Sequence, residues 1–210
     1  MKAVVTRDRA RAARAIEEFL AALGHSPTGE LEGTGERVAD AWCDELLSGE
    51  DRDPLSILAG GSLDLGDGSH GVVVLRDIAT STVCPHHLLP SHGFATIAYL
   101  PRRKAAGLGT LSEVVQALAR RMTLQETLGE DIAKVLVEGL DAKGALCRLD
   151  LTHTCFVARG ERQSGAVVTT LALSGSFGGP DRDLVLALLG RRDHEGGASG
   201  SAATERGGLP

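Results

Sequence analysis

Two clusters of cysteine and histidine, far apart in the sequence, constrain the fold of this chain more than any other feature. The first is a C-P-H-H segment that carries Cys84, His86 and His87. The second is an H-T-C segment that carries His153 and Cys155. Cysteine and histidine are ligands that suit zinc, and a catalytic zinc site commonly leaves one coordination position for water. We therefore expect the fold to bring both clusters together on one zinc ion.

The spacing alone leaves the ligand set open. Cys84, His86, His87 and Cys155 compete for three or four places, with His153 beside them. If all four bound zinc, the site would be closed and structural. If one histidine stays off the metal, it can shuttle protons, because the pKa of imidazole lies near neutrality. The surplus of histidines favours the open version, although buried cysteines are often only small apolar side chains.

The bulk composition indicates one good-sized cytoplasmic domain with reduced cysteines. The chain has 210 residues and a formal net charge of −6, with no block of Lys or Arg, which argues against a nucleic-acid surface. Residues 1–14 are charged and lack the apolar segment of a signal peptide. No apolar run approaches the ~20 residues of a membrane helix. In a reducing compartment, clustered cysteines are more often metal-binding or catalytic than disulfide-bonded.

Hydrophobic periodicity predicts helices and strands in alternating pairs. The predicted helices cover residues 8–23 and 36–47, two segments that follow capping boxes beginning at Thr110 and Thr123, and residues 180–189. The predicted strands cover residues 71–75, 94–100, 145–157 and 165–173. In the third strand, His153 and Cys155 are two residues apart and are expected to share one face. Residues 51–70, with Pro54 and several glycines, are interpreted as a linker.

This order of elements predicts an α+β fold, in which helices cover one face of an antiparallel sheet. We expect an N-terminal helical region at residues 1–50, a catalytic domain at 51–192 and a disordered Gly/Ala/Ser-rich tail at 193–210. The helical pair is expected to pack outside the sheet. Open sheet edges must be covered or paired, so an oligomer that joins sheets is expected.

Weaker signals surround the two clusters. Glu126 fits the last position of a capping box, which is a purely structural role. Arg159 and Arg162, on either side of Gly160 and Glu161, are interpreted either as an anion-binding corner or as solvated surface charges. Neither reading is decided by the pattern alone.

Several spaced motifs, in this order, make the chain similar to the GTP cyclohydrolase I family. They are E-R-V-A-D-A-W-C-D-E-L-L-S-G, C-P-H-H-L-L-P, G-F-A-T-I-A-Y-L-P, R-R-M-T-L-Q-E-T-L and H-T-C-F-V-A-R-G, which begin at residues 36, 84, 93, 120 and 153. The resemblance extends from about Ala15 to Leu189. It implies a tunnelling fold whose subunits join their sheets into a toroidal homo-oligomer, a decamer, with active sites at subunit interfaces.

The resemblance also implies a role for each residue that matches a family motif. It implies that zinc is held by Cys84, His87 and Cys155 and that the acid–base pair is His86 and His153. It implies that the purine is bound by Gln125 and Glu126 and that the triphosphate is contacted by Arg37 and Arg159. In the family reaction, water activated by zinc adds to C8 of GTP, formate leaves, and the ribose rearranges and recloses to dihydroneopterin triphosphate.

The chain departs from the family where phosphate binding is expected. Family members usually read G-L-S-K-x-x-R where this chain has Gly109, Thr110 and Glu113 in place of the serine, lysine and arginine. C-E-H-H has also become C-P-H-H at Pro85. Two cations are lost and one anion is gained, which counts against a triphosphate. Arg102, Arg103 and Lys104 lie nearby, at different positions, and are candidates to compensate for the lost cations.

Three hypotheses follow from these residues. The first is a zinc-dependent cyclohydrolase that opens the imidazole ring of a guanine-type purine with fewer phosphates than GTP, or none. The second is an ordinary GTP cyclohydrolase I that makes 7,8-dihydroneopterin triphosphate. The third is a zinc-bearing oligomer without catalysis, against which the acid–base histidines and Glu126 count, because a scaffold has no need of them.

Overall fold

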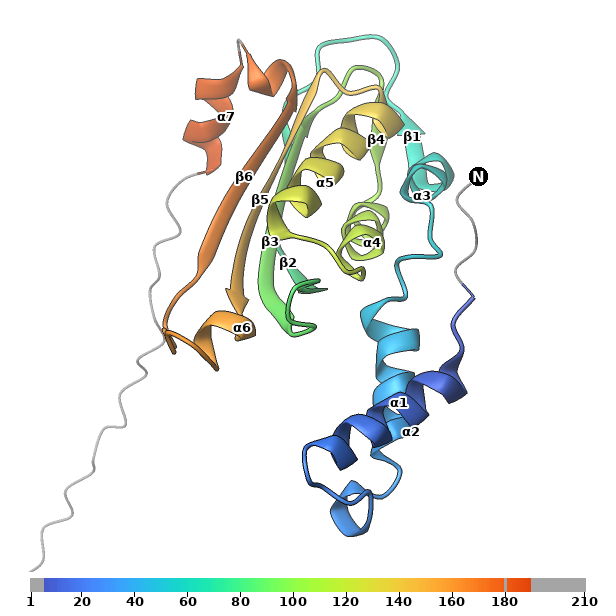
Figure 1. The fold of residues 1–210 in the computed structure, drawn as a ribbon. Coiled ribbons are helices and arrows are strands. Elements are labelled where there is room, and N and C mark those ends of the chain that lie inside the picture. Colours follow the sequence, from blue (N-terminus) through green and yellow to red (C-terminus); the bar gives the residue numbers. More distant parts are fainter. Residues whose placement is uncertain (1–5, 180, 190–210) are drawn as a thin grey trace, which may run out of the picture.

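The computed structural model describes residues 6–179 and 181–189, and it is an α+β fold around a four-stranded antiparallel sheet (Figure 1). The strand order is β2-β3-β5-β6, in which each strand runs antiparallel to its neighbour. The strands are β2 (Val73–Val83), β3 (Pro90–Leu100), β5 (Gly144–His153) and β6 (Val168–Gly175). The predicted α+β class with an antiparallel sheet is therefore confirmed. The strands at the two edges are β2 and β6.

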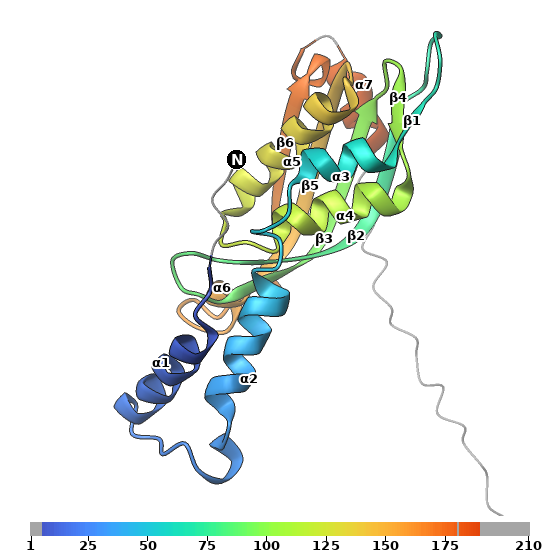
Figure 2. The same ribbon diagram turned by 90° about the vertical axis from the view of Figure 1, so that its right-hand side faces the viewer.

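Two helices, α4 (Leu108–Ala119) and α5 (Gln125–Leu140), cover one face of the sheet (Figures 1 and 2). Helix α5 buries a stripe with a spacing of four residues, formed by Leu128, Ile132, Leu136 and Leu140. Strand β5 turns every second residue toward this stripe, from Ala145 through Cys147, Leu149 and Leu151. Each fully buried leucine contributes roughly 1.5–3 kcal/mol. Matching periods of 3.6 and 2 residues therefore produce one continuous core.

The opposite face of the sheet is covered only in part. Helix α7 (Arg182–Leu189) packs there, and its Val185 joins a second, smaller cluster around Leu146 and Phe177. The expectation that helices lie on one face is therefore corrected at this end of the sheet. The helix corresponds to the one predicted at residues 180–189.

The N-terminal helical pair lies outside the sheet, as Figures 1 and 2 show. It consists of α1 (Arg9–Ala22), a short 3₁₀ turn at Gly29–Leu31, α2 (Thr34–Asp40) and a π-helical turn at Ala41–Leu46. Arg9 ties α1 to α2 and to the π-helical turn, because its guanidinium donates to Asp40 at 2.6 Å and to Asp44 at 2.6 Å. Arg121, which follows α4, holds the segment after the π-helical turn by donating to the Gly49 carbonyl at 3.0 Å.

The segment predicted to be a linker is largely structured. Helix α3 (Pro54–Gly61) begins where the Asp53 carboxylate accepts hydrogen bonds from the amides of Leu55 and Ser56. Strand β1 (Ser62–Asp64) follows and pairs with β4 (Lys104–Ala106). Asp-Pro is a helix-start signal, with the cap at Asp and proline at the first helical position. The linker interpretation gave too much weight to Pro54 as a breaker.

Both predicted capping boxes are wrong. Helix α4 begins at Leu108 after Gly107, and α5 begins at Gln125 after Leu124, and neither cap residue makes a side-chain hydrogen bond. The helices therefore start at positions set by packing, not by Thr110 or Thr123. Glu126 lies in the first turn of α5 with its side chain exposed, so its structural role as a capping residue is excluded.

The predicted disordered tail lies outside the described residues. Among the described helices, none combines the length and the apolar character that a membrane crossing needs.

Candidate metal centre

The C-P-H-H segment forms the loop between β2 and β3, at one end of the sheet. The strands extend further into this segment than predicted, because β2 continues to Val83 and β3 begins at Pro90. The loop closes on itself, since the Cys84 amide donates to the Leu89 carbonyl at 3.0 Å and the Leu88 amide donates to the Cys84 carbonyl at 2.9 Å. Leu88 accepts a positive φ of 54° to make this turn. The ligands of the first cluster are therefore held on a short loop between two paired strands.

The second cluster reaches the same place from β5. The ladder with β3 ends at the pair Ser91–His153, and the chain then turns into the short helix α6 (Thr154–Val157). The Thr154 hydroxyl donates to the Pro90 carbonyl at 2.6 Å and ties this turn to the loop. Cys155 is therefore helical, and the prediction that it shares a strand face with His153 is wrong. The turn, not strand alternation, brings its thiol toward Cys84.

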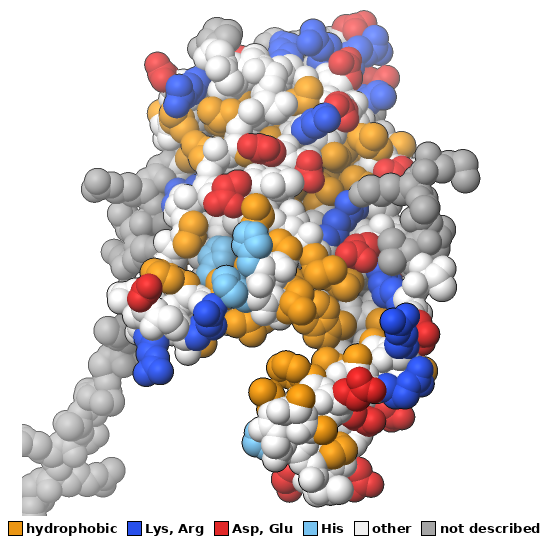
Figure 3. Space-filling model, in the orientation of Figure 1, with side chains coloured by type: hydrophobic (Ala, Val, Ile, Leu, Met, Phe, Trp, Pro, Cys, Tyr) orange, Lys and Arg blue, Asp and Glu red, His pale blue; other side chains and the backbone are white. Residues whose placement is uncertain are grey.

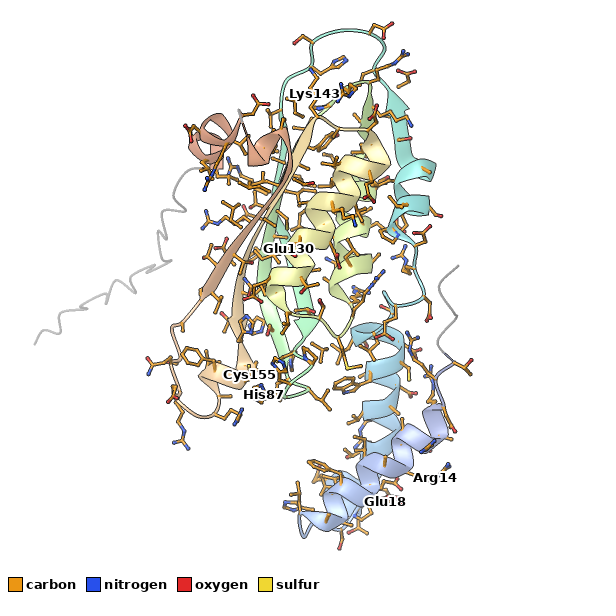
Figure 4. All side chains as sticks on the ribbon, turned by 45° about the horizontal axis from the view of Figure 1, so that its top comes forward. Arg14, Glu18, His87, Glu130, Lys143 and Cys155 are labelled. Carbon is orange, nitrogen blue, oxygen red and sulfur yellow. The ribbon has the colours of Figure 1, made fainter. Side chains whose placement is uncertain are left out.

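The structure brings Cys84, His87 and Cys155 together, and one ligand atom of each lies within 4.8 Å of the others. Figure 4 shows His87 and Cys155 side by side at this end of the molecule. Cys84 Sγ lies 3.7 Å from His87 Nδ1. A sulfur at ~2.3 Å and a nitrogen at ~2.05 Å from a tetrahedral zinc would lie about 3.6 Å apart. Two cysteine sulfurs and one imidazole nitrogen at this spacing fit three of the four positions around a tetrahedral zinc ion.

The electrostatics of the thiol pair agree with this fit. Burial, and then the proximity of the Cys84 thiol, raises the pKa of Cys155 above its ordinary value. The second effect is the mutual repulsion that two neighbouring thiolates would feel. A divalent cation shared by both sulfurs would remove it, because the charge of a bound ion dominates its surroundings.

His153 is held beside the metal group by two hydrogen bonds. Its Nε2 lies 2.7 Å from Gln125 Oε1, and its Nδ1 lies 2.9 Å from Ser91 Oγ. Burial lowers the pKa of His153, and the nearby Glu126 carboxylate opposes this shift. The structure thus brings His153, Gln125 and Glu126 to the same corner. Gln125, however, is buried and points its amide into the protein instead of offering it to a ligand.

His86 lies on the surface of the loop, with its ring edge-on to that of His87 at a centroid distance of 6.2 Å. It is outside the group of three candidate ligands. Figure 3 shows histidine side chains on the surface at this end of the sheet, above the N-terminal helical pair and next to hydrophobic side chains. Leu88, Met122 and Leu124 are among the exposed apolar side chains of the adjoining segments. A flat, partly apolar molecule could therefore lie beside these imidazoles.

The two arginines proposed for phosphate lie in different surroundings. Arg159 follows α6 with its side chain exposed, close enough to Cys155 to favour the thiolate electrostatically. Arg37 lies in α2, where its guanidinium donates to the Glu32 carbonyl at 2.8 Å and to the Thr34 hydroxyl at 2.9 Å. The fold of one chain therefore places Arg159 near the metal group, whereas the guanidinium of Arg37 is hydrogen-bonded within the helical pair.

The segment that departs from the family begins at the other end of the sheet. Strand β3 has 11 residues and spans roughly 33 Å from the metal group to its far end. Gly109 and Thr110 follow β4 there, and Glu113, one turn on, forms an ion pair with Arg52. Arg103, also near β4, pairs with Asp64 at 3.4 Å and with Asp67 at 3.1 Å. Gly109 and Thr110 therefore lie far from the metal group of their own chain.

Ser91 is the residue that the sequence interpretation missed. It faces His153 because the two are direct partners in the β3–β5 register. A serine between proline and histidine carries no catalytic signal, and the pairing register cannot be read from one strand alone. Its only sequence clue is its place next to the Cys/His loop.

Comparison with known protein families matches residues 12–188 to GTP cyclohydrolase I. The GTP cyclohydrolase 1 of Leifsonia xyli subsp. xyli is 43% identical over 185 residues, which cover 87% of this chain and 96% of that protein. That of Corynebacterium glutamicum (strain R) is 39% identical over 173 residues, 81% of this chain and 86% of its own. That of Bacillus subtilis (strain 168) is 37% identical over 166 residues, 78% and 85% of the two chains. The resemblance seen in the motifs is confirmed, and the chain belongs to the GTP cyclohydrolase I family.

Proposed function

We propose that this protein is a zinc-dependent GTP cyclohydrolase that opens the imidazole ring of GTP at C8, releases formate and forms 7,8-dihydroneopterin triphosphate. The relatives that match most of its length carry the name GTP cyclohydrolase 1. The observation that carries the proposal is the meeting of Cys84, His87 and Cys155 within 4.8 Å, with His153 beside them. The altered residues at 109–113 favour a substrate with fewer phosphates, whereas the relatives favour GTP.

The residues divide the work according to their positions. Zinc held by the two thiolates and the imidazole would supply Lewis-acid activation of water. The exposed His86 would exchange protons with the purine directly, and His153 would do so when substrate displaces one of its two hydrogen-bond partners. Glu126 would accept hydrogen bonds from the guanine N–H edge, since its carboxylate is exposed in the first turn of α5. Arg159 would contact phosphate.

The test is turnover of a substrate panel by the zinc-loaded protein. GTP, GMP, guanosine and guanine are incubated separately, and formate, ring-opened pyrimidines and pterins are measured by mass spectrometry. The proposal predicts that GTP is the best substrate and that the pterin triphosphate is the product. A clear preference for a nucleoside or the free base would contradict it. Glu126→Gln is measured on the same panel, and Glu130→Gln, changed one turn further along the same helix, serves as its matched control.

A second candidate is the same ring opening on a purine with fewer phosphates. It is favoured by one observation, the presence of Gly109, Thr110 and Glu113 where a serine and two cations are usual in the family. Glu113 already neutralises Arg52, so neither charge is offered to a phosphate. Each lost charge-assisted hydrogen bond costs roughly 1.5–3 kcal/mol of binding.

The oligomer decides how strongly this departure matters. We infer that subunits join at the sheet edges β2 and β6 into the toroid that the family resemblance implies. The far end of one sheet would then approach the metal group of a neighbour, which would bring residues 107–113 to the phosphates. If no purine derivative is turned over while zinc removal dissociates the oligomer, the third reading, a non-catalytic zinc-bearing assembly, is correct instead.

A further inference from the structure

Two buried polar side chains hold the proposed acid–base histidine. His153 Nε2 lies 2.7 Å from Gln125 Oε1, and His153 Nδ1 lies 2.9 Å from Ser91 Oγ. Ser91 is 1% exposed and Gln125 is 2% exposed. Because water has little access to either partner, the loss of one of these hydrogen bonds cannot be made good by solvent. Both ring nitrogens of His153 therefore depend on these two residues.

The hydrogen bonds of Gln125 define the direction of its amide. Its Nε2 donates to the Leu149 carbonyl at 3.1 Å, to the Val168 carbonyl at 2.9 Å and lies 3.1 Å from the Thr170 hydroxyl. Backbone carbonyls only accept, so the NH₂ group must face them and the amide oxygen must face His153. An amide oxygen also only accepts. His153 Nε2 therefore carries a proton.

The remaining nitrogen then sets the role of Ser91. In a neutral imidazole with a protonated Nε2, Nδ1 is an acceptor, so the Ser91 hydroxyl donates to it. The sheet imposes this contact, since Ser91 and His153 are direct partners across β3 and β5. Side chains of direct antiparallel partners begin about 4.5–5.5 Å apart, within reach of a hydroxyl and a ring nitrogen.

We infer that Ser91 is a positioning residue for His153, and that its hydroxyl, together with the Gln125 amide oxygen, fixes the ring in the Nε2–H tautomer beside the metal centre. Gln125 is thereby assigned to holding the histidine and not to contacting the purine. Without the Ser91 hydroxyl, the ring keeps one hydrogen bond and can turn about it. The effect on turnover rests on the proposed function, whereas the tautomer and the orientation of the ring do not.

The test compares Ser91→Ala with Thr80→Val. Thr80 lies on the same face of the sheet, and its hydroxyl bonds only within its own strand, to the Ile78 carbonyl at 2.8 Å among the described contacts. Nitrogen NMR of ¹⁵N-histidine-labelled protein reports which ring nitrogen of His153 carries the proton. We expect Ser91→Ala to keep the Nε2 proton and to move the Nδ1 signal toward that of a nitrogen without a hydrogen bond. Thr80→Val should leave both signals in place.

Steady-state kinetics on GTP separates positioning from folding. Ser91→Ala should lower kcat about fivefold to tenfold, the equivalent of one hydrogen bond, with KM and zinc content unchanged. Unchanged kcat and an unmoved Nδ1 signal in Ser91→Ala would overturn the inference, and so would an equal loss in Thr80→Val. If the unaltered protein turns over no purine while the Nδ1 signal moves as expected, the proposed function fails and the positioning of His153 stands.

Discussion

The cysteines of this chain lie in sharply different environments. Cys155 and Cys84 lie close enough to disfavour a second thiolate, whereas Cys147 is fully buried in the core. Burial alone raises the pKa of Cys147, which leaves it an inert, apolar thiol. The same residue type thus serves as a candidate ligand in one place and as packing in another.

Replacing Cys155 tests the metal group directly. We expect Cys155→Ala to lose bound zinc, because only Cys84 and His87 of the present group would remain. Cys43→Ala, which changes a cysteine outside the group, should keep one zinc per chain. Metal content measured by plasma mass spectrometry after dialysis checks both. Full zinc retention by Cys155→Ala would rule out this ligand set.

Glu126 is expected to contribute to substrate binding and not to the stability of the fold. Glu126→Gln replaces an exposed carboxylate that makes no capping contact, so the unfolding temperature should not change. An amide cannot accept two guanine N–H groups as a carboxylate does. Losing roughly 1.5–3 kcal/mol should lower kcat/KM by about ten- to a hundredfold. A kcat/KM within twofold of that of the unaltered protein would contradict the assignment of Glu126 to purine binding.

At the scale of elements, the close approach of β3 and β5 positions Ser91 against His153. Gly93 pairs with Leu151, two residues along the ladder from the Ser91–His153 pair. A Cβ on Gly93 would collide with the Asp150 carbonyl of β5. A backbone carbonyl in a central strand cannot move aside without breaking the ladder. Gly93 therefore allows the strand pairing on which the positions of Ser91 and His153 depend.

Gly93→Ala is expected to destabilise the protein. Overpacking costs roughly 1–3 kcal/mol in a well-packed interior, and a clash with backbone lies at the upper end of this range. Gly60→Ala, in the exposed helix α3 where an added Cβ meets nothing within 4 Å, should be neutral or slightly stabilising. Urea unfolding of the two variants measures the difference. Equal midpoints would show that β3 can shift away from β5.

The docking of α1 on α2 and on the π-helical turn that follows it is expected to depend on pH. The hydrogen bond from Arg9 lowers the pKa of Asp44 below its ordinary value of 3.8. A lowered folded-state pKa contributes stability that is present above the unfolded value and is lost as the pH falls through the folded value.

Arg9→Ala should therefore be less stable than the unaltered protein at neutral pH, and this difference should shrink as the pH falls below 3.8 toward the lowered pKa of Asp44. Thermal unfolding followed by circular dichroism across this range measures it. Arg11→Ala, which removes the same charge from the same helix, is the control. A difference that persists unchanged at low pH would show that Arg9 acts through packing and not through its ion pairs.

Much of this arrangement could be predicted from the sequence, because it follows from periodicity. The alternation around Leu149 and the four-residue stripe around Leu136 specify a strand and a helix wherever they occur. What could not be predicted depends on how the elements pair. The helical turn at Cys155 arises because β5 runs out of partner at Ser91, and the contact between Ser91 and His153 exists only in one register. Helix α3 was missed although its Asp53 cap signal is local, because proline was read as a breaker.

At the scale of the whole molecule, the metal group and the start of the altered segment lie toward opposite ends of the sheet. One chain therefore places the three candidate metal ligands at one end of the sheet, and Gly109 and Thr110 toward the other. An assembly that joins edges β2 and β6 is the arrangement that could bring these parts together from different subunits. Arg37, engaged within the helical pair of one chain, would likewise reach phosphate only from a neighbour or after leaving its present partners.

The most direct test of the central claim is a zinc titration of the metal-free protein in the presence of GTP. Formate release is followed as zinc is added, with the Cys84→Ala/Cys155→Ala double variant measured in parallel. We predict that activity is absent without metal, rises in proportion to bound zinc, saturates near one zinc per chain and never appears in the double variant. Full activity of the metal-free protein or of the double variant would contradict the account.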